Sequence, residues 1–141
     1  MRKWVPALLV LLLCAGCEVT PTNPFVGTWF GHGELTEPDT PGAGQTTVTM
    51  LDDAITFLED MTFALAQDFR MTVDGTLTTH AYQKGTGTYA YDAGTLTMTF
   101  DASSDPGLND DTPSYEFSAD GLTCTIQPTT LSFPIVFDKV P

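Results

Sequence analysis

Basic side chains are scarce in this sequence. Its 141 residues include 18 Asp and Glu but only five Lys and Arg, which gives a formal net charge of −13. Proteins that bind nucleic acid neutralise phosphates with Lys and Arg, so this balance excludes that class and disfavours docking on anionic lipid. We interpret the acidic surface as a source of solubility and of repulsion between molecules. Capture of a cation or of a basic partner is the alternative.

Reactive constellations are also lacking. The three cysteines are Cys14, Cys17 and Cys124. Cys124 alternates with Leu122 and Ile126, which predicts a small buried side chain and not a reactive thiol. The two histidines are distant in sequence from each other and from any cysteine, which makes a weak zinc signal. No nucleophile elbow, phosphate loop or dinucleotide fingerprint is present, so we expect no catalytic set and no cofactor.

Only one long hydrophobic run occurs, and it lies at the N-terminus. A basic start at residues 1–3 precedes an apolar stretch over residues 4–13, and small residues follow up to Cys17. The stretch is shorter than the roughly 20 residues of a membrane-spanning helix, and Pro6 would break a helix within it. The pattern is typical of a secretory signal peptide covering residues 1–16.

The end of this segment resembles a bacterial lipobox, where a peptidase cuts before a cysteine that carries lipid. Ala15, Gly16 and Cys17 match the motif, while Cys14 stands where leucine is usual. The resemblance implies a triacylated Cys17, with fatty chains such as palmitate, that anchors an exported protein to the membrane of the cell envelope. Glu18 follows Cys17 in place of Asp, which by the same resemblance implies the outer membrane, on its periplasmic or its outer side. An ordinary signal peptide cleaved elsewhere is the alternative.

The remainder of the chain reads as a linker and one domain. Residues 17–24 form a short polar linker that two prolines keep extended, and residues 25–141 are enough for one domain. Apolar residues alternate with threonines, as in Leu96, Met98 and Phe100, and no segment shows helical periodicity. The domain is therefore predicted to be all-β. We expect eight antiparallel strands, near residues 26–35, 45–58, 62–73, 76–91, 95–101, 114–118, 121–127 and 130–137.

The second of these strands changes phase. Val48 and Met50 have one parity, and Ile55 and Phe57 have the other. A bulge at Asp52-Asp53 would return both sets to the same face. A turn at the same place would raise the count to nine strands.

Short antiparallel links favour an up-and-down barrel, which closes and leaves no exposed edge. Strand parity then puts the connections over residues 36–44, 74–75, 102–113 and 128–129 at one end. Tight turns and both chain termini lie at the other end. A lipid on Cys17 would hold such a barrel with its loop-bearing end away from the membrane.

Several motifs resemble those of lipocalins and their bacterial lipocalin-like relatives. Residues 25–29 resemble the opening Gly-x-Trp of that family, residues 55–63 its second hairpin, and residues 87–97 a later strand-turn-strand. The resemblance implies a lipocalin-like barrel. It also implies that Trp29 plugs the closed end and that a basic residue past the last strand, here Lys139 in place of the usual Arg, stacks on it as a structural pair.

Large side chains dominate the inward rows, and an eight-stranded barrel is just wide enough to be filled by them or to hold one small ligand. Both possibilities remain open at this point. In a cavity, the polar groups are expected to be Gln67, Gln83, Tyr89, Tyr91 and Tyr115. An acidic mouth would disfavour carboxylate ligands and tolerate neutral or cationic amphiphiles.

The loop from residue 101 to 111 is rich in oxygen donors. Asp101, Asp105, Asp110 and Asp111 are weak candidates for Ca²⁺ ligands. Their spacing matches no EF-hand, and exported loops of this composition are usually solvated turns.

Two functions follow as expectations. The first is a membrane-tethered, lipocalin-like lipoprotein that binds a small hydrophobic molecule. The second is a packed barrel of the cell envelope that contacts another protein through residues 36–44 and 102–113. Neither is an enzyme.

Overall fold

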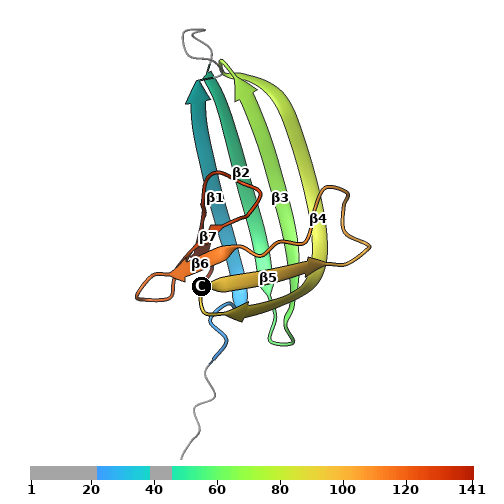
Figure 1. The fold of residues 1–141 in the computed structure, drawn as a ribbon, viewed down its shortest axis with the longest axis vertical. Coiled ribbons are helices and arrows are strands. Elements are labelled where there is room, and N and C mark those ends of the chain that lie inside the picture. Colours follow the sequence, from blue (N-terminus) through green and yellow to red (C-terminus); the bar gives the residue numbers. More distant parts are fainter. Residues whose placement is uncertain (1–21, 39–45) are drawn as a thin grey trace, which may run out of the picture.

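The computed structural model describes residues 22–38 and 46–141, and these form an all-β barrel. The expected signal peptide, Cys17 and most of the linker lie outside the described residues. Eight strands pair antiparallel with their neighbours in chain order, and β1 pairs with β8 to close the barrel (Figure 1). The predicted up-and-down topology with eight strands is confirmed. The strands are β1 (Gly27–Pro38), β2 (Thr46–Phe57), β3 (Thr62–Val73), β4 (Thr76–Asp92), β5 (Thr95–Phe100), β6 (Ser114–Phe117), β7 (Thr123–Gln127) and β8 (Ile135–Lys139).

The barrel has a long side and a short side. β1 to β4 have 12 to 17 residues each, whereas β5 to β8 have four to six. The short strands cross only the lower part of the tall sheet (Figure 1), because β5 pairs with residues 87–92 of β4 and β8 with residues 29–32 of β1. Closure is therefore confined to the lower half.

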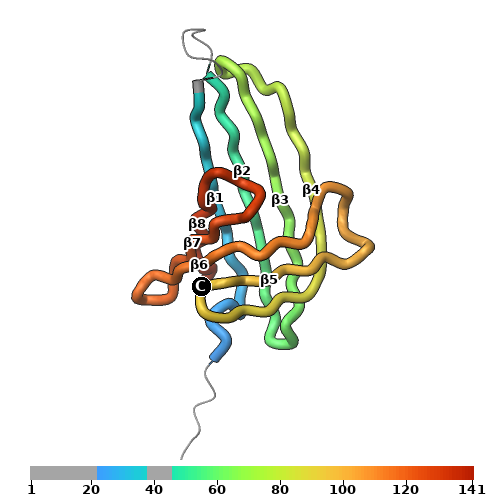
Figure 2. The backbone as a smooth tube through the Cα atoms, in the orientation of Figure 1, coloured from blue at the N-terminus to red at the C-terminus, as the bar shows by residue number. Residues whose placement is uncertain are grey.

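Closure requires β4 to bend from the tall sheet into the short strands, as the tube trace shows (Figure 2). Gly87 lies in this part of β4, opposite Phe100 of β5. A Cβ at Gly87 would lie 2.0 Å from the carbonyl oxygen of Thr99. Only glycine permits this approach of the two backbones, a recurrent use of glycine where a barrel turns.

The predicted bulge at Asp52-Asp53 is wrong. β2 pairs without interruption with β1 and with β3 through these residues, and the register shift of the tall sheet lies between Met71 and Thr72 of β3. Unbroken pairing keeps every ladder hydrogen bond of a long central strand. As a result Val48 and Met50 keep the outward parity of β2, and Asp53 points into the barrel.

Other expected boundaries also shift. β8 starts at Ile135 and not near residue 130, and β7 starts at Thr123, so Leu122 is left in the turn and is 57% exposed while Cys124 and Ile126 are buried. β1 continues to Pro38, which places strand in the first part of the expected loop 36–44, and residues 39–45 of that loop are outside the described residues. Burial raises the pKa of the Cys124 thiol to about 12, which fits an inert core residue.

The loops do not meet at one level. The turn at residues 74–75 stands at the top of the tall sheet, while the connections over residues 101–113 and 128–134 lie beside its middle (Figure 1). The expectation of a single loop-bearing rim is thus corrected, because β5 to β8 are at most half as long as β1 to β4. The start of β1 and the end of β8 both lie at the bottom of the barrel, where Trp29 pairs with Lys139.

The bottom of the barrel is closed by an aromatic plug. Phe25 is 1% exposed and its ring lies between 4.8 and 6.2 Å from five other rings, measured between centroids. The peptide N–H of Phe25 donates to the side chain of Asn23, a local turn that directs the ring inward. The rings that Phe25 contacts are those of Phe57, Tyr89, Tyr91, Tyr115 and Phe117.

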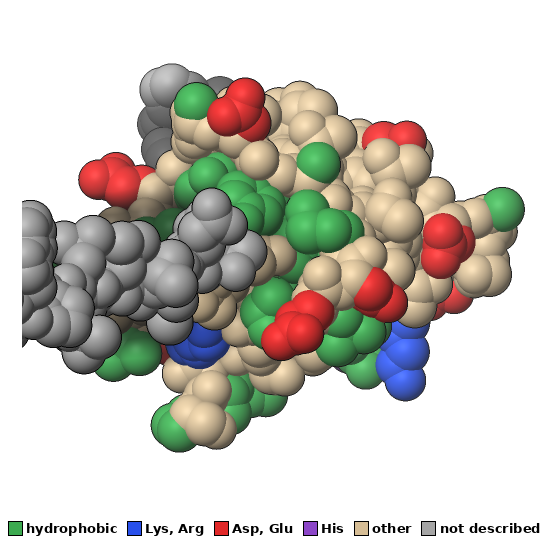
Figure 3. Space-filling view, turned by 90° about the horizontal axis from the view of Figure 1, so that it is seen from below, with side chains coloured by type: hydrophobic (Ala, Val, Ile, Leu, Met, Phe, Trp, Pro, Cys, Tyr) green, Lys and Arg blue, Asp and Glu red, His purple; other side chains and the backbone are tan. Residues whose placement is uncertain are grey.

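Seen from below, hydrophobic side chains gather near the middle of this end with acidic side chains around them (Figure 3). Leu58 and Val140, in the segments that leave β2 and β8, are exposed hydrophobic residues. No helix within residues 22–38 and 46–141 has the length and hydropathy to cross a membrane.

Candidate ligand-binding site

A cavity of about 190 Å³ lies inside the barrel. Alternation along β2 and β3 supplies its long wall, and the short strands face it from the other side. Most of its lining is apolar, and the cavity is partly open to solvent. The buried side chains that line it include Leu51, Leu65, Met98, Ile126, Ile135 and Phe137.

Two loops complete the cavity. Leu108 and Asn109 line it from the connection between β5 and β6, and Pro128 and Leu131 from the connection between β7 and β8. Leu108 packs against the core, although it belongs to a loop that is otherwise polar. The cavity is therefore bordered by ordered loop segments as well as by strands.

Asp53 is the polar exception in the cavity wall. It lies on β2 between Leu51 and Ile55, and its exposure is only 7%. Gln67 pairs with it directly on β3 and hydrogen-bonds its carboxyl group. The carboxyl oxygen Oδ1 of Asp53 is buried and has no hydrogen-bond partner among the described residues.

Burial dominates the electrostatics of Asp53. Loss of hydration raises the pKa of this carboxyl group to about 7, and the neighbouring charge of Asp52 adds to the rise, while the hydrogen bond from Gln67 opposes it. A buried carboxyl group with a free acceptor oxygen costs folding free energy unless something pairs with it. In a cavity wall, such a group is a candidate anchor for a ligand.

Of the polar groups predicted for a cavity, only Gln67 lines it. Gln83 instead donates from Nε2 to the carbonyl oxygen of Pro106 at 2.5 Å, which ties β4 to the loop over residues 101–113. The assignment of Gln83 to the cavity is thus wrong, because its amide is used to hold the loop.

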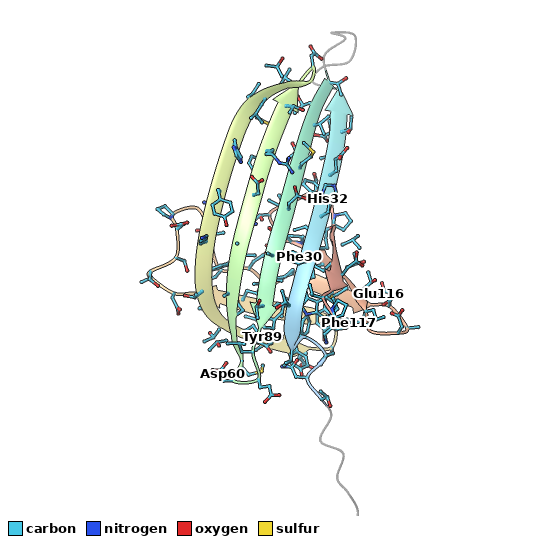
Figure 4. All side chains as sticks on the ribbon, turned by 180° about the vertical axis from the view of Figure 1, so that it is seen from behind. Phe30, His32, Asp60, Tyr89, Glu116 and Phe117 are labelled. Atoms are coloured by element: carbon cyan, nitrogen blue, oxygen red, sulfur yellow. The ribbon has the colours of Figure 1, made fainter. Side chains whose placement is uncertain are left out.

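The three tyrosines were also misplaced by the prediction. Tyr89, Tyr91 and Tyr115 pack around Phe25 in the aromatic plug and do not line the cavity. The hydroxyl of Tyr89 donates to the carbonyl oxygen of Leu58 at 2.9 Å and accepts from Asn23 at 2.7 Å, both at the bottom of the barrel. Tyr89 is labelled there in Figure 4.

The acidic loop residues do not converge on one point. Each carboxylate instead accepts from a neighbouring segment: Asp101 from the hydroxyl of Thr86, Asp105 from the peptide N–H of Lys84, Asp110 from that of Phe100 and Asp111 from Thr129. Across the described parts of the chain, no group of three or more His, Cys, Asp or Glu could hold a metal ion. These aspartates fasten the loop to β4 and β5 and, through Asp111, to the loop before β8.

The structure brings Trp29 and Lys139 together at the closed end. The Nζ atom of Lys139 lies 5.1 Å from the centroid of the Trp29 ring. Trp29 is 1% exposed and donates from Nε1 to the carbonyl oxygen of Phe25 at 2.7 Å. The pair therefore braces the aromatic plug and lies away from the cavity.

A ladder of charges crosses the outer face of β1 to β4. His32 hydrogen-bonds Asp52 at 2.6 Å, Arg70 bridges Asp52 and Asp68, and Asp68 accepts from His80 at 2.7 Å. His32 is labelled on β1 in Figure 4, above the level of the aromatic plug. The side chains are partly exposed, so these pairs contribute little stability individually.

One signal in the sequence could have revealed Asp53. Ile55 and Phe57 define an inward parity, and its plain continuation along the strand includes Asp53 and Leu51. The acidic pair suggested an interruption instead. In a long strand that is paired on both sides, continued alternation predicts side-chain direction better than an acidic pair predicts a bulge.

Comparisons with known proteins add no family to this description. No family model matches the chain, and no curated protein matches it. Among solved structures it is similar to Rv2717c from M. tuberculosis, with 13% sequence identity over 84% of this chain and 94% of that chain, and a TM-score of 0.33.

Proposed function

We propose that this protein is a membrane-tethered, lipocalin-like lipoprotein whose barrel binds a small hydrophobic molecule. The cavity between β2, β3 and the short strands carries this proposal. A cavity of about 150 Å³ is enough for benzene, so the volume here suits a ligand with one ring or a short branched chain. A longer lipid tail would not fit within it.

The lining supports binding in this cavity. Apolar walls give affinity, and a few polar groups give orientation, which is the usual composition of a small-molecule site. The bottom of the barrel is packed with aromatic rings. Further along the same strands the inward side chains do not fill the interior, and this leaves the cavity above the plug.

The position of the tether is the second part of the proposal. Lipid on Cys17 would join the barrel through residues 18–24 at the bottom, near the exposed Leu58 and Val140. The turn at residues 74–75, at the top of the tall sheet (Figure 1), would then point away from the membrane. Replacement of Cys17 by Ser should abolish incorporation of labelled palmitate and release the chain from the envelope membrane. Persistent labelling would contradict the assignment.

Binding can be tested with toluene as an apolar probe. The full chain is held in phosphatidylcholine nanodiscs, and titration of empty nanodiscs gives the blank. We expect saturable binding that Leu65→Phe abolishes, because Leu65 lines the cavity and is buried. Leu77→Phe is the matched control, since Leu77 is exposed and lies outside the cavity lining.

Absence of saturable binding would overturn the proposal. The same titration after incubation with an envelope lipid extract tests whether a natural occupant already fills the cavity. If neither toluene nor an extracted molecule binds, the barrel acts as an envelope module that contacts another protein through residues 36–44 and 102–113.

A further inference from the structure

We propose that the cavity selects a small amine, with its ammonium group on Asp53 and its apolar body among the surrounding side chains. This inference rests on the proposed function and names the ligand class. It starts from an unpaired acceptor: Asp53 Oδ1 is buried in the cavity wall and no group of the described protein reaches it.

The nearest side chains leave the anchor incomplete. Gln67 hydrogen-bonds the carboxyl group of Asp53 from the adjacent strand. On the other side of Asp53, β1 presents Gly31, which has no side chain to donate. A Cβ at Gly31 would lie 2.4 Å from the Phe137 ring, so no larger residue fits there without displacing that ring. A molecule in the cavity that Asp53 lines would supply a donor to this carboxyl group.

The charges around the cavity favour a cation over a neutral donor. The titratable side chains in its lining are Asp53 and Asp111, and no Lys, Arg or His is among them. Asp111 is already engaged by Thr112 and Thr129. On the outer face Asp52 adds a further negative charge, although it is paired with Arg70 and His32. An ammonium group would provide the counter-charge that the wall lacks.

The same geometry rejects anions. A carboxylate ligand would bring a second negative charge against Asp53 in a poorly hydrated site, where like charges repel strongly. The net charge of −13 also attracts cations and repels anions before contact. Selection thus acts both on approach and within the cavity.

A pH dependence follows from this arrangement. Burial raises the pKa of Asp53 to about 7, so the free carboxyl group loses its proton as pH rises from 6 to 8. Benzylamine remains protonated over this range and pairs with the ionised form. Its affinity should therefore increase with pH, whereas the affinity for toluene should stay constant.

The test compares four probes of one size on the full chain in phosphatidylcholine nanodiscs: benzylamine, benzyl alcohol, toluene and benzoate. We expect benzylamine to bind about tenfold or more tighter than toluene at pH 8, because charge-assisted hydrogen bonds exceed apolar contact alone. Benzyl alcohol should lie between them, and benzoate should bind weakest.

Variants then isolate the anchor. Asp53→Asn should remove the preference for benzylamine and the pH dependence of its binding. The affinity for toluene should change less than about threefold, which is less than the contribution of one hydrogen bond to a charged group. Asp52→Asn is the matched control, because it removes the same charge one residue away on the outer face, and it should leave the benzylamine preference in place.

The outcomes separate the two proposals. If toluene binds in the cavity but benzylamine binds no better, or Asp53→Asn leaves the preference unchanged, the amine inference is wrong and the apolar cavity stands. If no probe binds at all, the proposed function fails together with it. Benzylamine binding that Asp52→Asn abolishes and Asp53→Asn spares would place the amine on the outer charge ladder and overturn the inference.

Discussion

The aromatic plug and the cavity above it use the same strands in opposite ways. On the inward row of β2, Phe57 is surrounded by aromatic rings, while Asp53, four residues earlier, faces a cavity. Alternation directs both side chains inward. Whether an inward side chain meets a partner depends on what lies across the barrel. Phe25 fills the plug, and no residue of the described segments fills the space beside Asp53 in the same way.

The largest loss of stability should come from disrupting the aromatic plug. Phe25→Ala removes the ring at the centre of the aromatic plug, and loss of a buried Phe costs about 3–5 kcal/mol. Urea unfolding followed by circular dichroism measures the change in the free energy of unfolding. Phe30→Ala is the control, because Phe30 is 59% exposed on β1; its cost should stay near 0.5 kcal/mol. Equal costs would contradict the role of Phe25 as the plug.

Asp53 should make the stability of the fold depend on pH. Folding raises the pKa of its carboxyl group from 3.8 to about 7. Between these values the unfolded chain has already lost a proton that the folded chain keeps, so the free energy of unfolding falls as pH rises and levels off above pH 7. At 1.36 kcal/mol per unit, the total is at most about 4 kcal/mol.

Asp53→Asn should remove this share of the pH dependence, as measured by urea unfolding at pH 4.5 and pH 8. Asp120→Asn is the control: hydrogen bonds from Ser118 and Leu122 lower the pKa of that carboxyl group, so it is ionised at both pH values and its replacement should leave the difference between them nearly unchanged. If Asp53→Asn leaves the difference between the two pH values unchanged, the carboxyl group is not buried as described.

The brace on the plug should have a smaller effect. Lys139→Met removes the cation from the buried Trp29 ring, and such contacts contribute about 0.5–1 kcal/mol at partly exposed sites. Lys84→Met is the control, since Lys84 lies 5.4 Å from the ring centroid of Tyr82, which is largely exposed. A larger loss at Lys84 would show that the Trp29 contact adds nothing to closure.

Much of the fold could be predicted because it depends on local alternation. Strand number, antiparallel order and closure follow from period-two rows and short links, and the pairing of Trp29 with Lys139 places both at the bottom. Loop height could not be predicted, because it depends on β5 to β8 being much shorter than the sheet they close. That difference in length is a tertiary property.

The candidate site was harder to predict. Gln67 was identified because it is a polar residue in an otherwise apolar inward row. Asp53 was missed because it is adjacent to Asp52, and the acidic pair was interpreted as a bulge or turn in the strand. Tyr89 and Gln83 were assigned to the cavity by parity alone. Parity gives the direction of a side chain and not its height in the barrel, and height separates the plug from the cavity.

The most direct test is a crystal structure of the protein grown with 4-bromobenzylamine, with the bromine located by its anomalous signal. Our account predicts one bromine inside the barrel among Leu65, Met98 and Phe137, and the amine nitrogen within hydrogen-bonding distance of the Asp53 carboxyl group. A barrel whose cavity is filled by its own side chains, with bromine only on the outer face beside Phe30 and Tyr82, would contradict it.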